Sequence, residues 1–159
     1  MKILFVCTHN RCRSILAEAL ANHFGRGYIS AASAGSNASK EVHPLTMLAL
    51  KSRGISVDGL HSKSWYDLEE FMPEVVITVC DNAAGEACPL WLGDALKIHW
   101  GLADPSTIEG DIDKKLAAFD ITMNTLSQRL LGLAELLESD PGNDCVREYL
   151  KSWQEVKTE

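Results

Sequence analysis

The 159-residue sequence has no long hydrophobic run and no excess of basic residues. A bilayer-spanning helix needs about 18 consecutive apolar residues, and the N-terminal apolar run at residues 3–6 is far shorter. That run is also too short for a secretory signal, so we expect a cytoplasmic protein. The formal net charge is −7, from 15 basic and 22 acidic residues. Because phosphate groups attract basic surfaces, this balance argues against nucleic acid or an anionic membrane as the partner.

The sequence also lacks a complete set of zinc ligands. It contains five cysteines: Cys7, Cys12, Cys80, Cys88 and Cys145. No further Cys or His pair with zinc-site spacing completes a four-ligand set, so we expect no metal centre. Structural disulfides are rare in the cytosol, which leaves buried apolar residues or working thiols as the interpretations of these cysteines.

Short β-branched and apolar runs alternate with amphipathic stretches along the chain. The pattern predicts strands at residues 2–6, 28–33, 75–79 and 95–99, and helices at 15–24, 44–52, 113–139 and 143–156. This order is typical of a single α/β domain with a four-stranded parallel sheet flanked by helices. Ligands of such sheets bind at the carboxyl ends of the strands.

The turn after the first predicted strand carries the strongest functional motif. Its residues are Cys7, Thr8, His9, Asn10, Arg11, Cys12, Arg13 and Ser14. Backbone N–H groups in the turn and the start of the next helix favour an anion, and Arg13 has a planar fork that grips two oxygens. The motif therefore predicts a site for a tetrahedral oxyanion such as phosphate or arsenate, in which the positive field favours a Cys7 thiolate. The alternative is that Cys7 merely ends a strand and Arg13 caps a surface helix.

An Asp-Pro pair follows the fourth predicted strand. Asp104 should therefore lie at the same edge of the sheet as Cys7, where it can protonate a leaving oxygen as a general acid. Asp-Pro pairs are common at turns, so the pair gains weight only together with the oxyanion loop.

The Cys-x5-Arg-Ser loop after the first strand, with Asn10 three residues beyond Cys7, resembles that of low-molecular-weight protein tyrosine phosphatases and related arsenate reductases. The resemblance covers residues 1–138 and implies a Rossmann-type open sheet. It leaves 139–159 as a C-terminal helical extension, for which docking on the domain or a partner contact are both open. In the phosphatases, aromatic residues typically follow the Asp-Pro pair. Here Ser106 and Thr107 follow, which disfavours a phosphotyrosine substrate.

Two further cysteines separate reductase from hydrolase. Cys80 follows the third predicted strand, so it should lie at the same edge of the sheet as Cys7. Cys88 lies eight residues later, across an expected loop of small residues. Phosphoryl transfer changes no oxidation state, whereas the reduction of arsenate to arsenite takes two electrons, which a dithiol supplies. The alternative is that both thiols are buried packing residues.

This segment resembles thioredoxin-coupled arsenate reductases. The resemblance implies a relay in which Cys7 attacks arsenate, Cys80 attacks Cys7, and Cys88 attacks Cys80, with Asp104 assisting the departure of water. It also implies thioredoxin, or glutathione and glutaredoxin, as the electron donor. Two other hypotheses remain open: a phosphatase acting on phosphotyrosine or a small phosphate ester, and a redox-sensing oxyanion-binding module.

In the resembling reductases, residues matching Asn10, Glu18 and Ser33 support the loop, partly through a bound potassium ion. The acidic residue expected near position 63 is Lys63 here. We therefore expect its ammonium group to replace the ion, and we expect neither a metal nor another cofactor.

Overall fold

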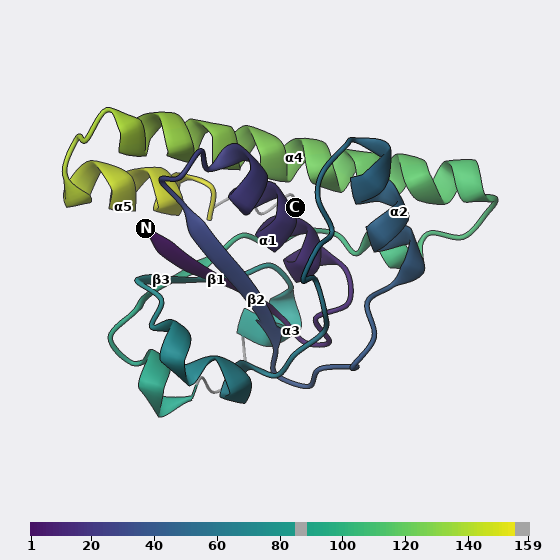
Figure 1. The fold of residues 1–159 in the computed structure, drawn as a ribbon, viewed down its shortest axis with the longest axis horizontal. Helices are drawn as coiled ribbons and strands as arrows, with labels where there is room; N and C mark the ends of the chain where they lie inside the picture. Colours follow the sequence, from purple (N-terminus) through teal and green to yellow (C-terminus); the bar gives the residue numbers. More distant parts are fainter. Residues whose placement is uncertain (85–88, 155–159) are drawn as a thin grey trace.

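The computed structural model describes residues 1–84 and 89–154. Its strands are β1 (Lys2–Cys7), β2 (Ser30–Gly35), β3 (Val75–Thr78) and β4 (Leu96–His99). They form one parallel sheet in the order β2-β1-β3-β4 (Figure 1). The predicted four-stranded parallel sheet is confirmed.

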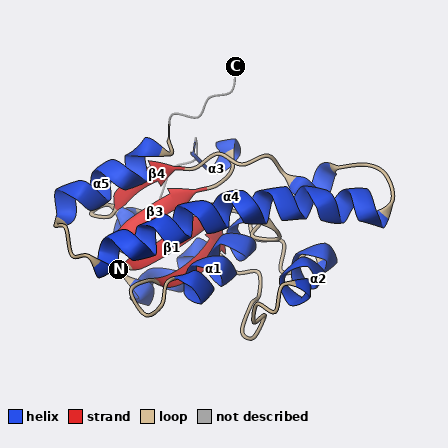
Figure 2. Ribbon diagram, turned by 90° about the horizontal axis from the view of Figure 1, so that it is seen from above, coloured by secondary structure: helices blue, strands red, loops and turns tan. Residues whose placement is uncertain are grey.

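Helices surround this sheet. They are α1 (Arg13–Phe24), α2 (Pro44–Ser52), α3 (Asp81–Ala84), α4 (Ile112–Glu138) and α5 (Asn143–Ser152), with 3-10 helices η1 (Trp65–Phe71), η2 (Leu90–Leu92) and η3 (Pro105–Thr107). Figure 2 shows α1, α4 and α5 on the same face of the sheet. No helix in the described part of the chain is long and apolar enough to cross a membrane.

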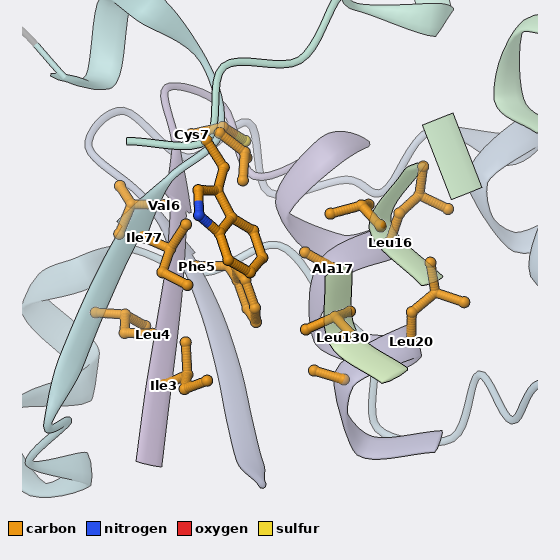
Figure 3. Close-up of a cluster of buried hydrophobic side chains, with 14 of the residues drawn as sticks. Ile3, Leu4, Phe5, Val6, Cys7, Leu16, Ala17, Leu20, Ile77 and Leu130 are labelled. Atoms are coloured by element: carbon orange, nitrogen blue, oxygen red, sulfur yellow. The ribbon is translucent and has the colours of Figure 1, made fainter. Parts of the chain in front are cut away.

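The central strand β1 is buried because it has neighbours on both sides. Ile3, Leu4, Phe5 and Val6 are all fully buried, as expected for an inner strand of a parallel sheet. Figure 3 shows Ile3 and Phe5 on the side of β1 that faces Leu16 and Leu20 of α1 and Leu130 of α4, while Leu4 and Val6 point to the opposite side. Each fully buried Leu or Ile contributes about 2 kcal/mol of hydrophobic free energy, so this layer holds β1 firmly against the helices.

The long helix α4 is capped at its N-terminus by Asp111, whose side chain accepts a hydrogen bond from the Lys114 backbone N–H at 2.9 Å. Acceptors at this position satisfy N–H groups that have no partner inside the helix. An apolar stripe at steps of three and four along this predicted helix is buried at Phe119, Met123, Leu126, Leu130 and Leu133.

Two expectations about element boundaries were wrong. The second strand was expected at residues 28–33, but β2 begins at Ser30, because the Tyr28 N–H closes a turn onto the Gly25 carbonyl at 2.7 Å. Residues 81–84 were expected in a loop but form the single helical turn α3, whose Ala83 N–H donates to the Cys80 sulfur at 3.4 Å.

The strand register brings the functional segments to one edge. Cys7 pairs with Gly35, and Thr78 pairs with both Val6 and His99. The residues that follow β1, β3 and β4 therefore all leave the sheet at its carboxyl edge.

Candidate active site

The oxyanion loop connects β1 to α1 and is held from outside. The carbonyls of Thr8, His9 and Arg11 accept backbone hydrogen bonds at 2.8–3.0 Å from Asn37, Ser39 and His43, respectively. Because the N–H of the next residue points away from each carbonyl, these contacts turn loop N–H groups toward the interior of the loop. A ring of such N–H groups is the arrangement that binds anions.

Asn10 occupies the left-handed backbone region, with a φ of 49°, which Asn tolerates better than most residues. Its side chain is fully buried and donates to Ser14 Oγ at 2.7 Å and to Ser33 Oγ at 3.0 Å. Its Oδ1 accepts from the Lys63 backbone N–H at 2.9 Å. The amide therefore ties the middle of the loop to two neighbouring segments.

Ser14 connects this network to the nucleophile. Its Oγ lies 2.8 Å from the Cys7 sulfur. Since Asn10 donates to the Ser14 oxygen, the hydroxyl proton of Ser14 is free to point at the sulfur. A donor directed at sulfur stabilises the thiolate over the thiol.

Lys63 lies behind the loop at the end of the same network. Its Nζ is 3.1 Å from Glu18 Oε1, 3.5 Å from Ser33 Oγ and 3.2 Å from the His61 carbonyl oxygen. The side chains of Lys63 and Glu18 are each only 10% exposed. The Lys63 ammonium group thus lies among these three oxygens. It occupies the place where the resemblance implied a bound potassium ion.

Arg13 and Asp104 face each other across the pocket. Arg13 donates from Nη1 to the Leu102 carbonyl at 2.9 Å, and its Nη2 lies 3.5 Å from Asp104 Oδ2. Burial alone would raise the pKa of Asp104. Two hydrogen bonds from Ser106 and the charges of Arg13 and Arg11 outweigh it and hold that pKa below its ordinary value. In the absence of substrate, Asp104 is therefore ionised and paired.

Cys80 shares the pocket with Cys7, as the sequence predicted. Both sulfur side chains are almost fully buried, and both line a cavity of about 210 Å³. The Cys80 sulfur lies 3.6 Å from the Thr8 hydroxyl. The cavity is lined by Cys7, Thr8, His9, Arg11, Cys12, Arg13, Cys80, Asp104 and Ser106.

Cys12 lines the cavity too but differs in character from Cys7. Burial raises the pKa of Cys12 to about 12, only partly opposed by a hydrogen bond with Thr46. At neutral pH this thiol is protonated. Cys145 is exposed on α5 and lies outside the cavity lining.

Cys88, the predicted third thiol of the relay, lies outside the described residues. Within residues 1–84 and 89–154, no group of three or more His, Cys, Asp or Glu side chains is arranged to hold a metal ion.

Several contacts of the site were not predicted. The Leu102 carbonyl that accepts a hydrogen bond from Arg13 is a backbone group, so the amino-acid type at position 102 could not indicate this contact. Ser106 was noted only as a departure from an aromatic pattern, yet it donates to Asp104 Oδ1 from both its N–H and its hydroxyl, at 2.9 and 2.6 Å. Asp side chains commonly accept a hydrogen bond from the backbone two residues on, so the sequence could have predicted the contact between Ser106 and Asp104.

Comparison with known proteins gives a consistent family. The model of the family described as "Low molecular weight phosphotyrosine protein phosphatase" matches residues 2–143. An arsenate reductase of Halalkalibacterium halodurans is 32% identical over 134 residues, covering 84% of this chain and 94% of the relative. A glutaredoxin arsenate reductase of Synechocystis sp. is 29% identical over 123 residues, covering 72% and 92%.

Solved structures agree with these relatives. An arsenate reductase in its phosphate-binding state is 28% identical with a TM-score of 0.69, covering 86% of this chain and 98% of its own. A thioredoxin-dependent arsenate reductase of Corynebacterium glutamicum is 25% identical with a TM-score of 0.66, covering 87% and 62%.

Proposed function

The chain belongs to the low molecular weight phosphotyrosine protein phosphatase family, and on that premise we propose that it is an arsenate reductase, converting arsenate to arsenite. The observation that carries this proposal is the position of Cys80, whose thiol lines the same oxyanion pocket as Cys7. A phosphatase needs one nucleophile there, whereas a reductase needs a second thiol to take up the arsenic-bound sulfur. The arsenate reductases among the relatives support the same conclusion.

The first step forms the arsenic adduct. The Cys7 thiolate attacks arsenic, a sulfur–arsenic bond forms, and one arsenic–oxygen bond breaks. Loop N–H groups and Arg13 hold the remaining oxygens, and the departing oxygen leaves as water after it receives a proton from Asp104. Arsenic stays pentavalent in this step.

Asp104 has to be protonated to serve in this way. In the free pocket, Arg13 lies 3.5 Å from the Asp104 carboxylate. An arsenate dianion attracts the Arg13 fork to itself and places negative charge beside Asp104. Both changes raise the pKa of Asp104, so substrate binding itself promotes protonation of the acid.

The second step transfers the electrons. The Cys80 thiolate attacks the Cys7 sulfur, a disulfide forms, and the sulfur–arsenic bond breaks with its electron pair remaining on arsenic. Arsenic becomes trivalent and leaves as arsenite, while the two thiols are oxidised to one disulfide. The Cys88 thiolate then attacks Cys80, which releases Cys7 and leaves a Cys80–Cys88 disulfide.

The electron donor we propose is a dithiol protein of the thioredoxin or glutaredoxin class, acting in the cytoplasm, where such thiols are kept reduced. Relatives carry both names. We propose residues 1–138 as the catalytic domain, with no further cofactor, no nucleic-acid partner and no membrane partner.

Hydrolysis of phosphate esters is the second candidate, because Cys7, Arg13 and Asp104 also suffice for phosphoryl transfer. We expect it as a residual activity. Ser106 stands close to Asp104 where an aromatic residue would hold a phosphotyrosine ring, so arsenate reduction should be the stronger activity.

The two activities are separated in one assay. Purified protein is mixed with thioredoxin, thioredoxin reductase and NADPH, and arsenate-dependent NADPH loss is compared with aryl phosphate hydrolysis. Glutaredoxin with glutathione replaces thioredoxin in a parallel mixture. Cys80→Ser should abolish NADPH loss and leave hydrolysis, while Cys145→Ser, the matched control, should leave both unchanged. Arsenate-independent NADPH loss, or hydrolysis alone, would refute the reductase.

A further inference from the structure

Helix α5 lies beyond most of the family match, which ends at residue 143, yet it is firmly packed. Val146 and Leu150 are buried, and the Tyr149 hydroxyl donates to the Arg129 carbonyl of α4 at 2.6 Å. Gly132 makes this approach possible: a Cβ there would collide with the Tyr149 hydroxyl. A glycine inside a long helix weakens that helix, so its presence is explained by the space it leaves for α5.

Arg129 connects the extension to the end of β4 through two aromatic rings. Its guanidinium lies over the Trp100 ring, 5.5 Å from the ring centre, and over the Trp153 ring, 5.1 Å from that ring centre. Arg129 is 5% exposed, and its Nε and Nη1 have no hydrogen-bond partner in the described part of the chain. Burial lowers the pKa of Arg129, against a smaller opposing effect of Tyr149. The two ring faces therefore supply much of the attraction that holds this cation.

The contact continues to the strand that ends at the active site. The Trp100 indole N–H donates to the Leu150 carbonyl at 3.0 Å. The backbone N–H of His99 donates to Gln154 Oε1 at 3.0 Å. Residues 99 and 100 are thus held by α5 and by the residues directly after it.

His99 in turn contacts the segment of the second thiol. Its Nε2 lies 2.8 Å from Asp81 Oδ1, and its Nδ1 lies 2.8 Å from the Thr78 hydroxyl. Asp81 directly follows Cys80 and begins α3, whose Ala83 N–H donates to the Cys80 sulfur. One continuous set of contacts therefore leads from Gln154 through His99 and Asp81 to Cys80.

We propose that the C-terminal extension is a positioning element for the thiol relay. Gln154 holds His99 directly, and Trp153 supports the neighbouring Trp100 through Arg129. His99 in turn fixes the Asp81 end of α3 and so the direction of the Cys80 sulfur. The expected effect on the thiol relay rests on the proposed reductase function, whereas the positioning of Cys80 does not depend on it. Residues 7–14 are held by other contacts, so the extension should affect the second thiol step much more than the first.

The test compares Trp153→Ala and Gln154→Ala with the matched control Glu148→Ala, an exposed α5 residue, all in full-length chains carrying Cys88→Ser. Arsenate is added, samples are acid-quenched, and the Cys7–Cys80 disulfide is quantified by mass spectrometry. We expect Trp153→Ala and Gln154→Ala to slow disulfide formation by about fivefold to tenfold. Aryl phosphate hydrolysis needs only Cys7, Arg13 and Asp104, and its rate should stay within about twofold of the control.

A second measurement does not depend on arsenate. Alkylation of Cys80 and Cys7 by iodoacetamide is followed by peptide mass mapping. Loss of the His99 contact should raise the alkylation rate of Cys80 severalfold and leave that of Cys7 unchanged. If the Cys88→Ser parent forms no Cys7–Cys80 disulfide with arsenate, the reductase function fails, and the alkylation measurement still decides the positioning role.

Gly132→Ala provides a third variant that separates docking from helix stability. Helix propensity alone predicts that alanine at this position makes the protein more stable. If α5 must stay docked, the added Cβ instead collides with the Tyr149 hydroxyl and displaces α5. We expect this variant to show the same Cys80 effects as Trp153→Ala. Unchanged Cys80 alkylation in all three variants, with circular dichroism confirming a folded chain, would overturn the proposal.

Discussion

The Ser14 hydroxyl lies 2.8 Å from the Cys7 sulfur and is oriented by the Asn10 amide. Ser14→Ala removes the donor, and a hydrogen bond to a charged group contributes roughly 1.5 kcal/mol. We expect iodoacetamide to alkylate Cys7 about tenfold more slowly at pH 7 in this variant. Ser52→Ala, in α2 and outside the cavity lining, is the control and should leave the rate unchanged. An unaffected Cys7 in the Ser14 variant would contradict the role of this contact.

Cys12 should behave in the opposite way to Cys145. Because burial raises the pKa of Cys12 to about 12, its thiol stays protonated, and we expect no alkylation at pH 8 while exposed Cys145 reacts. The raised pKa also stabilises the fold below the ordinary cysteine pKa, and this contribution is lost as the pH rises through about 12. Urea unfolding between pH 8 and 11 should show a decline that Cys12→Ala reduces. Equal alkylation of the two cysteines would contradict this account.

Ser106 should set the pH range of the acid. Its side-chain hydrogen bond lowers the pKa of Asp104, so Ser106→Ala should raise that pKa and move the alkaline limb of the kcat/KM profile to higher pH. Thr107→Ala is the matched control, because its hydroxyl donates to the Asp104 backbone carbonyl and not to the carboxylate. A profile that shifts equally in both variants would assign the effect to the turn and not to the carboxylate.

Lys63 should make the protein indifferent to potassium. We expect equal activity in KCl and NaCl at the same ionic strength, because the ammonium group already lies 3.1 Å from Glu18. Lys63→Met should destabilise the fold by about 3 kcal/mol in urea, since it leaves a buried carboxylate unpaired. Exposed Lys51→Met should cost less than about 0.5 kcal/mol. Marked activation of the wild type by potassium over sodium would refute the expectation.

The sequence was sufficient to predict the sheet and the place of the main thiols. Cys7 and Arg13 flank a polar segment between an apolar run and an amphipathic stretch, and this local order is retained in β1 and α1. Cys80 could be placed near Cys7 because parallel strands end at one edge of their sheet.

Contacts between distant residues could not be predicted in the same way. Trp100, Arg129 and Trp153 are widely separated, and no periodicity connects them. The α3 turn was missed because Ala83 and its small neighbours are equally typical of a loop, and the Cys80 contact that favours the turn is tertiary. The Arg13 contact with Leu102 depends on a backbone carbonyl, which is the same in every residue.

The relay is tested most directly by Cys88→Ser supplied with arsenate, thioredoxin, thioredoxin reductase and NADPH. With the third thiol removed, Cys7 and Cys80 should become trapped as a disulfide that the donor does not reach. The account predicts one arsenite per protein molecule and a Cys7–Cys80 linked peptide in the mass spectrum. Continued NADPH consumption over many turnovers, or a variant whose Cys7 and Cys80 remain free after arsenite is released, would contradict it.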